Sequence, residues 1–176
     1  MDRIVGYVPP VAFRQTMQDY LDGKGTPWDL EKRLKTSAND GALLYAIGDK
    51  YLERGQFDKA RSQMEQVLSR DPNNTAGKTD DAMFAQARMY RLESKWYKAV
   101  EVLRRMLTKY PTTDRREEAT AYIPWLYAQA GDTTEAVRYY RDFVKDFKNS
   151  SENGWAKEQI ERLEPSSGAP PAGKTQ

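Results

Sequence analysis

The chain has 176 residues, a net charge of +2 from 28 Lys and Arg against 26 Asp and Glu, and neither cysteine nor histidine. Without these two residue types, disulfides, thiolate zinc sites and cysteine nucleophiles are excluded within the chain, and an enzyme would lack the commonest general base. The small net charge gives no general attraction to nucleic acid or anionic membrane. Because cysteine and histidine are missing, the sequence favours a non-catalytic protein without cofactor or metal.

The first 21 residues predict a strand and a helix that fit no repeat. Residues 4–7 favour a short strand, Pro9 and Pro10 a turn, and residues 11–21 an amphipathic helix. The apolar face of this helix consists of Val11, Phe13, Met17, Tyr20 and Leu21.

This strand, turn and helix resemble the end of a thioredoxin fold, in which VGY is followed by a turn and the closing helix. The resemblance implies that residues 1–24 are the remnant of a thioredoxin-like domain that precedes a repeat array in a bacterial protein. The Cys-x-x-Cys site and cis-proline loop of that family are absent from this chain. The alternative is a capping helix with a frayed lead. A strand at residues 4–7 without neighbouring strands would also have an unpaired edge, which could bind a second copy in a weak homodimer.

A second helix is predicted to follow Thr26, which serves as its N-cap, with Pro27 in the first turn. Trp28, Leu30 and Leu34 should face inward. We expect this helix to pair with Phe13 and Tyr20 of the preceding one and so form an irregular leading hairpin.

Three similar stretches come next: YLERGQFDKA from Tyr51, YRLESKWYKA from Tyr90 and YAQAGDTTEA from Tyr127. Each sets a tyrosine nine residues before an alanine. A compact residue lies three positions before each tyrosine, and a large one lies four positions after each alanine. The compact residues are Gly48, Ala87 and Pro124, and the large ones are Met64, Leu103 and Tyr140.

Apolar spacing within the first copy predicts two antiparallel helices joined at Gly55, a residue suited to a left-handed helix end. Gly48 and Ala60 should lie where these helices approach most closely. The pattern resembles the tetratricopeptide repeat over roughly residues 41–148. This resemblance implies an all-α fold, an alpha-alpha superhelix of helical hairpins with a short non-repeat N-terminal segment. An ordinary helical bundle is the alternative.

Two departures from the usual 34-residue period stand out. The tyrosines are 39 and 37 residues apart, which requires either longer linkers or following helices that start earlier; we favour longer first helices. The helices after the two linkers should be capped by Thr79 or Asp80 and by Thr113 or Asp114. Pro124 falls inside the first helix of the third copy and should kink that helix.

A terminal helix over residues 151–163, capped by Ser151 or Glu152, should turn Trp155, Ile160 and Leu163 toward the array. The tail 165–176 is rich in Pro, Gly and Ser and is expected to be disordered. Residues 25–164 then form the array with its capping helices.

Chemical motifs are weak throughout the chain. The acidic pairs Asp80 with Asp81 and Glu117 with Glu118 suit helix N-termini better than a metal. GKTD at Gly77 lacks the earlier glycine of a nucleotide-binding loop. A basic cluster in the second repeat could contact RNA or an acidic peptide, although interleaved acids favour a solvated face; it comprises Arg88, Arg91, Arg104, Arg105, Lys109, Arg115 and Arg116.

The tetratricopeptide resemblance implies a concave surface, formed by the first helices, that binds peptides. Carried over to this sequence, its inner positions are Tyr45, Asp49, Leu52, Phe84, Arg88, Arg91, Tyr122, Trp125 and Gln129. The lysine and asparagine set that clamps chaperone C-termini is absent, because Tyr45 and Asp49 occupy those places. Tyr45, Phe84 and Trp125 should form an aromatic row, unless the leading and terminal helices bury it.

The leading hypothesis is therefore a protein-protein interaction scaffold that binds a peptide or protein in a concave groove. One alternative is the regulatory or client-binding part of a thioredoxin-like redox protein, and another is an RNA- or anion-binding array. No run of about 18 apolar residues predicts membrane insertion, and the start of the chain lacks the pattern of a secretion signal. We expect a soluble protein of the bacterial cytoplasm or periplasm.

Overall fold

The structure is a computed structural model that describes residues 10–37 and 40–164. Within these ranges it consists of nine α-helices and contains no strand. Their bounds are α1 Pro10–Leu21, α2 Pro27–Leu34, α3 Gly41–Glu53, α4 Phe57–Arg70, α5 Thr79–Leu92, α6 Trp96–Lys109, α7 Arg116–Gln129, α8 Thr133–Asp146 and α9 Asn153–Leu163.

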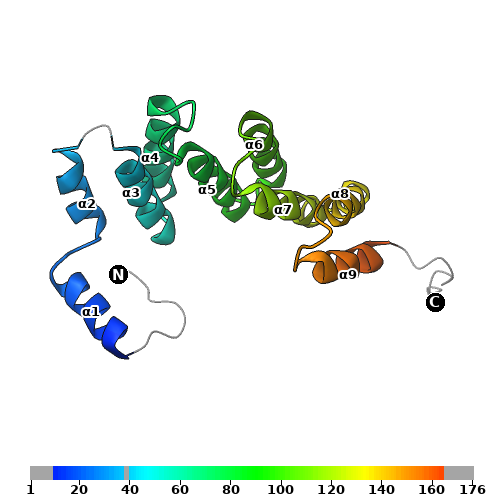
Figure 1. Ribbon diagram of the computed structural model, residues 1–176, viewed down its shortest axis with the longest axis horizontal. Helices are drawn as coiled ribbons and strands as arrows, with labels where there is room; N and C mark the ends of the chain where they lie inside the picture. The colour runs from blue at the N-terminus through cyan, green and yellow to red at the C-terminus, as the bar shows by residue number, and fades with distance from the viewer. Residues whose placement is uncertain (1–9, 38–39, 165–176) are drawn as a thin grey trace, which may run out of the picture.

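The helices from α3 to α8 form three hairpins that stack into one array (Figure 1). Helix α3 packs on α4, α5 on α6 and α7 on α8, and each second helix also packs on the first helix of the next hairpin. Helix α9 packs on α8 and closes the far end. The predicted all-α architecture of helical hairpins is confirmed.

The recurring tyrosine marks the end of each first helix. The backbone N–H groups of Gln56, Lys95 and Asp132 donate to the carbonyl oxygens of Tyr51, Tyr90 and Tyr127 at 2.9, 2.8 and 2.9 Å. The residue before each donor is left-handed, with φ of 69° at Gly55, 56° at Ser94 and 81° at Gly131. This bonding closes a helix in a tight turn and satisfies a terminal carbonyl. The recurring tyrosine in the sequence therefore marks the same tight turn in each of the three hairpins.

The recurring alanine lies inside each hairpin. Ala60, Ala99 and Ala136 are fully buried, and so are the large residues that follow them, Met64, Leu103 and Tyr140. Gly48 is buried against Met64 and Gln63 of α4, as expected for a close helix crossing. Pro124 lies inside α7 and is buried.

The expectation of longer first helices is wrong. Helix α3 has 13 residues, and the other five helices of the hairpins have 14 each. The additional residues lie in the linkers, eight at 71–78 and six at 110–115. The two linkers are in contact through a hydrogen bond in which the Tyr110 hydroxyl donates to the Pro72 carbonyl at 2.8 Å.

The cap residue is predicted correctly at two of four helices. The Thr26 side chain accepts from the Asp29 N–H and caps α2 as predicted. Glu152, one of the two residues predicted for α9, occupies its cap position but makes no side-chain cap bond. For α5 and α7 the cap positions are Lys78 and Arg115, and the predicted residues bond elsewhere. The Thr79 hydroxyl donates to the Asp71 carbonyl, and that of Thr113 donates to the Asp80 carboxylate.

The leading hairpin is not formed as predicted. Helix α2 packs on α3, whereas α1 makes no extensive contact with α2 and lies apart from the hairpins in Figure 1. Leu30 is buried at 7% exposure, but Trp28 is 69% exposed and does not face inward. Amphipathic spacing identifies an apolar face, yet without a packed neighbour that face stays in solvent.

Some predictions lie outside the described residues. These are the strand at 4–7, the side chains of Phe13 and Tyr20, and the disordered tail at 165–176. Among the helices that are described, none has the length and apolar character needed to cross a membrane.

Candidate functional site

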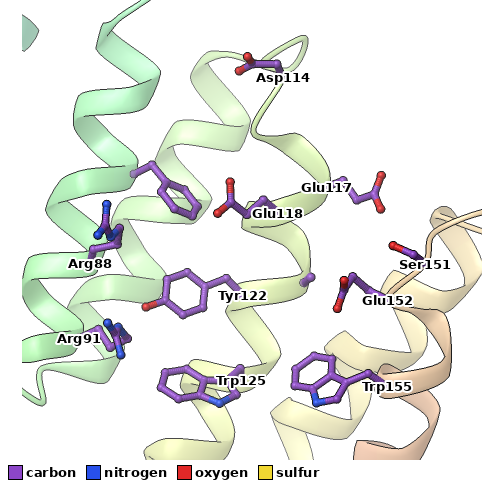
Figure 2. A pocket seen from close by; sticks show the side chains of 12 residues that line it. Arg88, Arg91, Asp114, Glu117, Glu118, Tyr122, Trp125, Ser151, Glu152 and Trp155 are labelled. Atoms are coloured by element: carbon purple, nitrogen blue, oxygen red, sulfur yellow. The ribbon is translucent and has the colours of Figure 1, made fainter. Parts of the chain in front are cut away.

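A groove of about 660 Å³ lies where α5, α7 and the start of α9 come together (Figure 2). Helix α5 contributes Phe84, Arg88 and Arg91. The linker and helix α7 contribute Asp114, Glu117, Glu118, Ala121, Tyr122 and Trp125. The turn before α9 contributes Ser151 and Glu152, and α9 itself contributes Trp155. Neither α5 with α7 nor α7 with α9 is in extensive backbone contact, so side chains define the space between these helices.

The spacing along each helix places these residues on one face. Phe84, Arg88 and Arg91 recur at four and three residues along α5, and Glu118, Tyr122 and Trp125 do the same along α7. Residues at this spacing share one side of an α-helix. The sequence therefore turns two parallel stripes toward a common groove.

Aromatic rings form the floor of the groove. The Tyr122 ring lies 5.9 Å from Phe84 and 5.7 Å from Trp125, between ring centroids, and it is stacked on Trp125 at 28°. Trp96 contacts Trp125 edge-on at 6.2 Å. Burial raises the pKa of the Tyr122 hydroxyl. The result is a continuous row of rings from Phe84 on α5 through Tyr122 to Trp125 on α7.

Arg91 lies beside this floor with an unmet hydrogen-bonding requirement. Its guanidinium carbon is 5.9 Å from the Trp125 ring centroid, in cation–π contact. Its Nε is buried and has no acceptor, and no carboxylate among the described residues is within ion-pair distance of Arg91. Arg88 is more exposed and has only a distant pair, 3.8 Å from Asp49. A guanidinium donates hydrogen bonds to carboxylates, so the terminal nitrogens of Arg91 can bind an anionic group of a partner.

The opposite side of the groove is acidic. Glu118 is paired with Arg115 at 2.7 Å. In the part of the chain that the structure describes, Asp114, Glu117 and Glu152 have no cation within ion-pair distance. Figure 2 places the two arginines on α5 and Glu117, Glu152 and Trp155 on the far side of α7. Trp155 packs edge-on against Tyr140 at 5.4 Å and remains 36% exposed.

A buried polar network holds the linker at the upper end of the groove. Asp80, at 5% exposure, accepts from the Thr113 hydroxyl at 2.6 Å. Asp81 accepts from Arg115 Nε at 2.8 Å and from Lys78 at 2.7 Å. Burial alone would raise the pKa of Asp81, but these two hydrogen bonds and charges hold it below its ordinary value. The network joins α5 to the start of α7 and fixes Arg115 over the Phe84 ring at 5.3 Å.

Five of the nine sequence-predicted site residues line this groove. They are Phe84, Arg88, Arg91, Tyr122 and Trp125. The predicted aromatic row is wrong in one member, because Tyr122 connects Phe84 to Trp125 and Tyr45 is not in contact with either ring. Phe84 is itself largely core, at 6% exposure.

The other four predicted residues lie elsewhere. Tyr45 is half-buried under Lys78, whose Nζ is 5.5 Å from its ring, and burial raises its pKa to about 12. Asp49 faces Arg88, and burial raises the pKa of its carboxyl. Leu52 is buried in the core of the first hairpin, and Gln129 is exposed at the end of α7.

Sequence reasoning missed the acidic side and the contribution of α9. The missed residues are Asp114, Glu117, Glu118, Ala121, Ser151, Glu152 and Trp155. The helical stripe of Tyr122 and Trp125 could have indicated Glu118. Nothing in the sequence indicates that α9 begins beside α7. The basic cluster is also divided, since Arg104, Arg105 and Lys109 lie on α6 and do not line the groove.

Metal binding finds no support within the described ranges, which contain no group of three His, Cys, Asp or Glu side chains able to hold an ion. The acidic side of the groove is therefore a charged surface without a metal-ligand arrangement.

Comparisons with known proteins agree with the arrangement of helical hairpins. A sequence model of the tetratricopeptide repeat family matches residues 45–113, and a second model of that family matches residues 125–150. The two matches together cover more than half of the chain. A search of curated proteins finds no match. The comparisons give no support to the thioredoxin-like resemblance of residues 1–24.

Two solved structures illustrate the likeness in fold. Nearly identical TPR-like repeats assigned to a kinesin light chain of Podosopora anserina have a TM-score of 0.64 and 16% identity, over 85% of this chain and 82% of that one. MamA has a TM-score of 0.58 and 14% identity, over 90% of this chain and 94% of that one. At these identities the likeness concerns the fold alone.

Proposed function

Because the chain belongs to the tetratricopeptide repeat family, we propose that it is a non-catalytic scaffold whose groove between α5, α7 and α9 binds a segment of a partner protein. Tetratricopeptide repeats generally serve as protein-interaction scaffolds. The stacked hairpins present their first helices side by side, and such a surface suits an extended or helical segment.

The observation that carries the proposal is the state of Arg91. Its guanidinium lies beside a half-exposed aromatic surface, and no carboxylate among the described residues is within ion-pair distance of it. Hydrogen bonds to charged groups contribute about 1.5–3 kcal/mol, so a partner carboxylate at the terminal guanidinium nitrogens would bind favourably. Aromatic side chains and arginine also supply most of the binding energy where they occur together. The partner segment should therefore carry a carboxylate and an apolar anchor.

RNA is a poorer occupant of this groove. Arg88 and Arg91 could contact phosphates, but the same groove contains Asp114, Glu117 and Glu152 without neutralising cations. Each of these carboxylates would repel a phosphate backbone. Protein is thus favoured over nucleic acid by the charge of the groove itself.

The test is affinity capture from the source cell with two matched variants. Arg91→Gln removes one of the two cations of the groove, and Arg105→Gln removes an exposed arginine of α6 outside it, which has no carboxylate within ion-pair distance among the described residues. A partner that is retained by Arg105→Gln and lost by Arg91→Gln supports the proposal. Equal retention by both variants contradicts it. Thermal unfolding of both variants provides the control for folding.

A further inference from the structure

The charges of the groove are separated, and this separation bears on the class of partner. Helix α5 contributes the cations Arg88 and Arg91 to the lining. Across α7, toward α9, lie the carboxylates Glu117 and Glu152 (Figure 2). The aromatic surface of Tyr122 and Trp125 lies between the two groups. The other two lining carboxylates are Asp114 in the linker and Glu118, which is paired with Arg115.

We propose that the groove selects a segment of mixed charge, with a carboxylate over α5, a lysine or arginine beside Glu117 and Glu152, and an apolar side chain between them on Tyr122 and Trp125. This inference rests on the proposed function and specifies its partner. It assigns an orientation as well, because the acidic end of the segment must lie at α5 and the basic end at α9.

Both charged ends are available to a partner. Arg91 lines the groove and has no carboxylate within ion-pair distance among the described residues. Glu117 and Glu152 likewise have no cation within ion-pair distance there. By contrast, Glu118 is neutralised by Arg115, which also bonds to Asp81. The groups left unpaired are thus those at the two sides of the groove, and a segment with both charges would complete them.

A segment with a single kind of charge fits less well. An acidic segment would pair with Arg91 but would bring its remaining carboxylates against Glu117 and Glu152. A basic segment would meet Arg88 and Arg91. Like charges held close together discriminate against such partners, while complementary charges fix the register of the right one.

The distance across the groove limits the spacing of the two charges. Helix α7 lies between α5 and α9, so the two charged ends of a bound segment cannot be adjacent in its sequence. An extended chain rises about 3.3 Å per residue, so the acidic and basic residues should be several positions apart. The apolar anchor should fall near the middle of that interval.

Selection from a library of random dodecapeptides displayed on phage tests this directly, with the whole chain as bait. Enriched peptides should pair an acidic with a basic residue several positions apart, in one constant order, around an apolar residue. For such a peptide, Arg91→Gln and Glu152→Gln should each weaken binding about two- to tenfold. Arg105→Gln and Glu161→Gln, at exposed positions on α6 and α9 outside the groove, should leave it unchanged.

A charge-exchanged protein gives the sharper test. When all four charges are exchanged, the order of acidic and basic residues in the selected peptides should reverse; the changes are Arg88→Glu, Arg91→Glu, Glu117→Arg and Glu152→Arg. Peptides with acidic residues alone that bind as tightly as mixed ones would overturn this inference and leave the proposed function standing. Failure to enrich any peptide would overturn both. Enrichment of peptides that match the chain itself, with a dimer mass by light scattering, would assign the groove to a second copy.

Discussion

Gly48 of α3 lies directly against Met64 of α4, so that a Cβ placed on this glycine would be 2.8 Å from the Met64 terminal methyl carbon. The same Cβ would be 3.1 Å from Cβ of Gln63. Met64 is fully buried and its flexible end would have to shift, whereas Cβ of Gln63 is fixed by the backbone of α4. The separation of the first pair of helices therefore depends on the absence of one methyl group.

Gly48→Ala should destabilise the array by about 1–3 kcal/mol, because the added carbon overpacks the crossing of α3 and α4. Gly154→Ala is the matched control: it lies in α9, and a Cβ there would meet nothing within 4 Å. The control should be neutral or stabilising by about 0.5–1 kcal/mol, since alanine favours a helix over glycine. Urea unfolding measures both changes. If Gly48→Ala is no worse than the control, the close contact is not limiting.

Trp125 should be accessible to solvent in the free protein, because it is only half-buried in the groove. Acrylamide should then quench part of the fluorescence that distinguishes the wild type from Trp125→Phe. A bound peptide should protect this component, since its apolar anchor would cover the ring. Complete protection of Trp125 in the free protein would contradict an open groove.

Thr113→Val should cost about 1–3 kcal/mol, because it removes the hydroxyl that donates to the buried Asp80 carboxylate at 2.6 Å. Thr112→Val, at the exposed neighbouring position, serves as the control and should be nearly neutral. The free energies of unfolding in urea give the comparison. Equal effects at the two positions would show that the Asp80 bond does not hold the linker.

Asp81 should make stability depend on acid pH. Its pKa in the folded chain is below the ordinary value, so its ionised form favours the folded state. That contribution is complete above about pH 4 and is lost as the pH falls through the lowered pKa of the folded state. Asp81→Asn should therefore have a lower Tm than wild type at neutral pH, and the difference should shrink below about pH 4.

Asp142→Asn, which alters an exposed pair with Arg138 at 3.7 Å, provides the control for this pH series. Exposed pairs contribute little, so its Tm should follow the wild type throughout. A constant difference between Asp81→Asn and wild type from neutral to acid pH would exclude the carboxylate as its source.

The array and much of the groove were predictable because their signals are local. A helix places residues four and three apart on one face, so Phe84, Arg88 and Arg91 had to lie together on α5 wherever that helix packed. The turns were equally explicit, since Gly55 and Gly131 permit the left-handed conformation that ends a first helix. Ser94 adopts the same conformation at the middle turn, where only the register of the repeat indicates it.

Tertiary structure decided what surrounds those faces. Trp28 has the spacing of an inward residue but remains exposed, because no neighbour packs on its face of α2. Trp155 and Glu152 join the groove because α9 packs on α8 and begins beside α7. The period of a helix fixes which residues share a side through backbone geometry alone. How far apart two helices lie, and which third helix closes the space between them, depends on linkers and packed side chains distant in the sequence, so those features arise only in the folded chain.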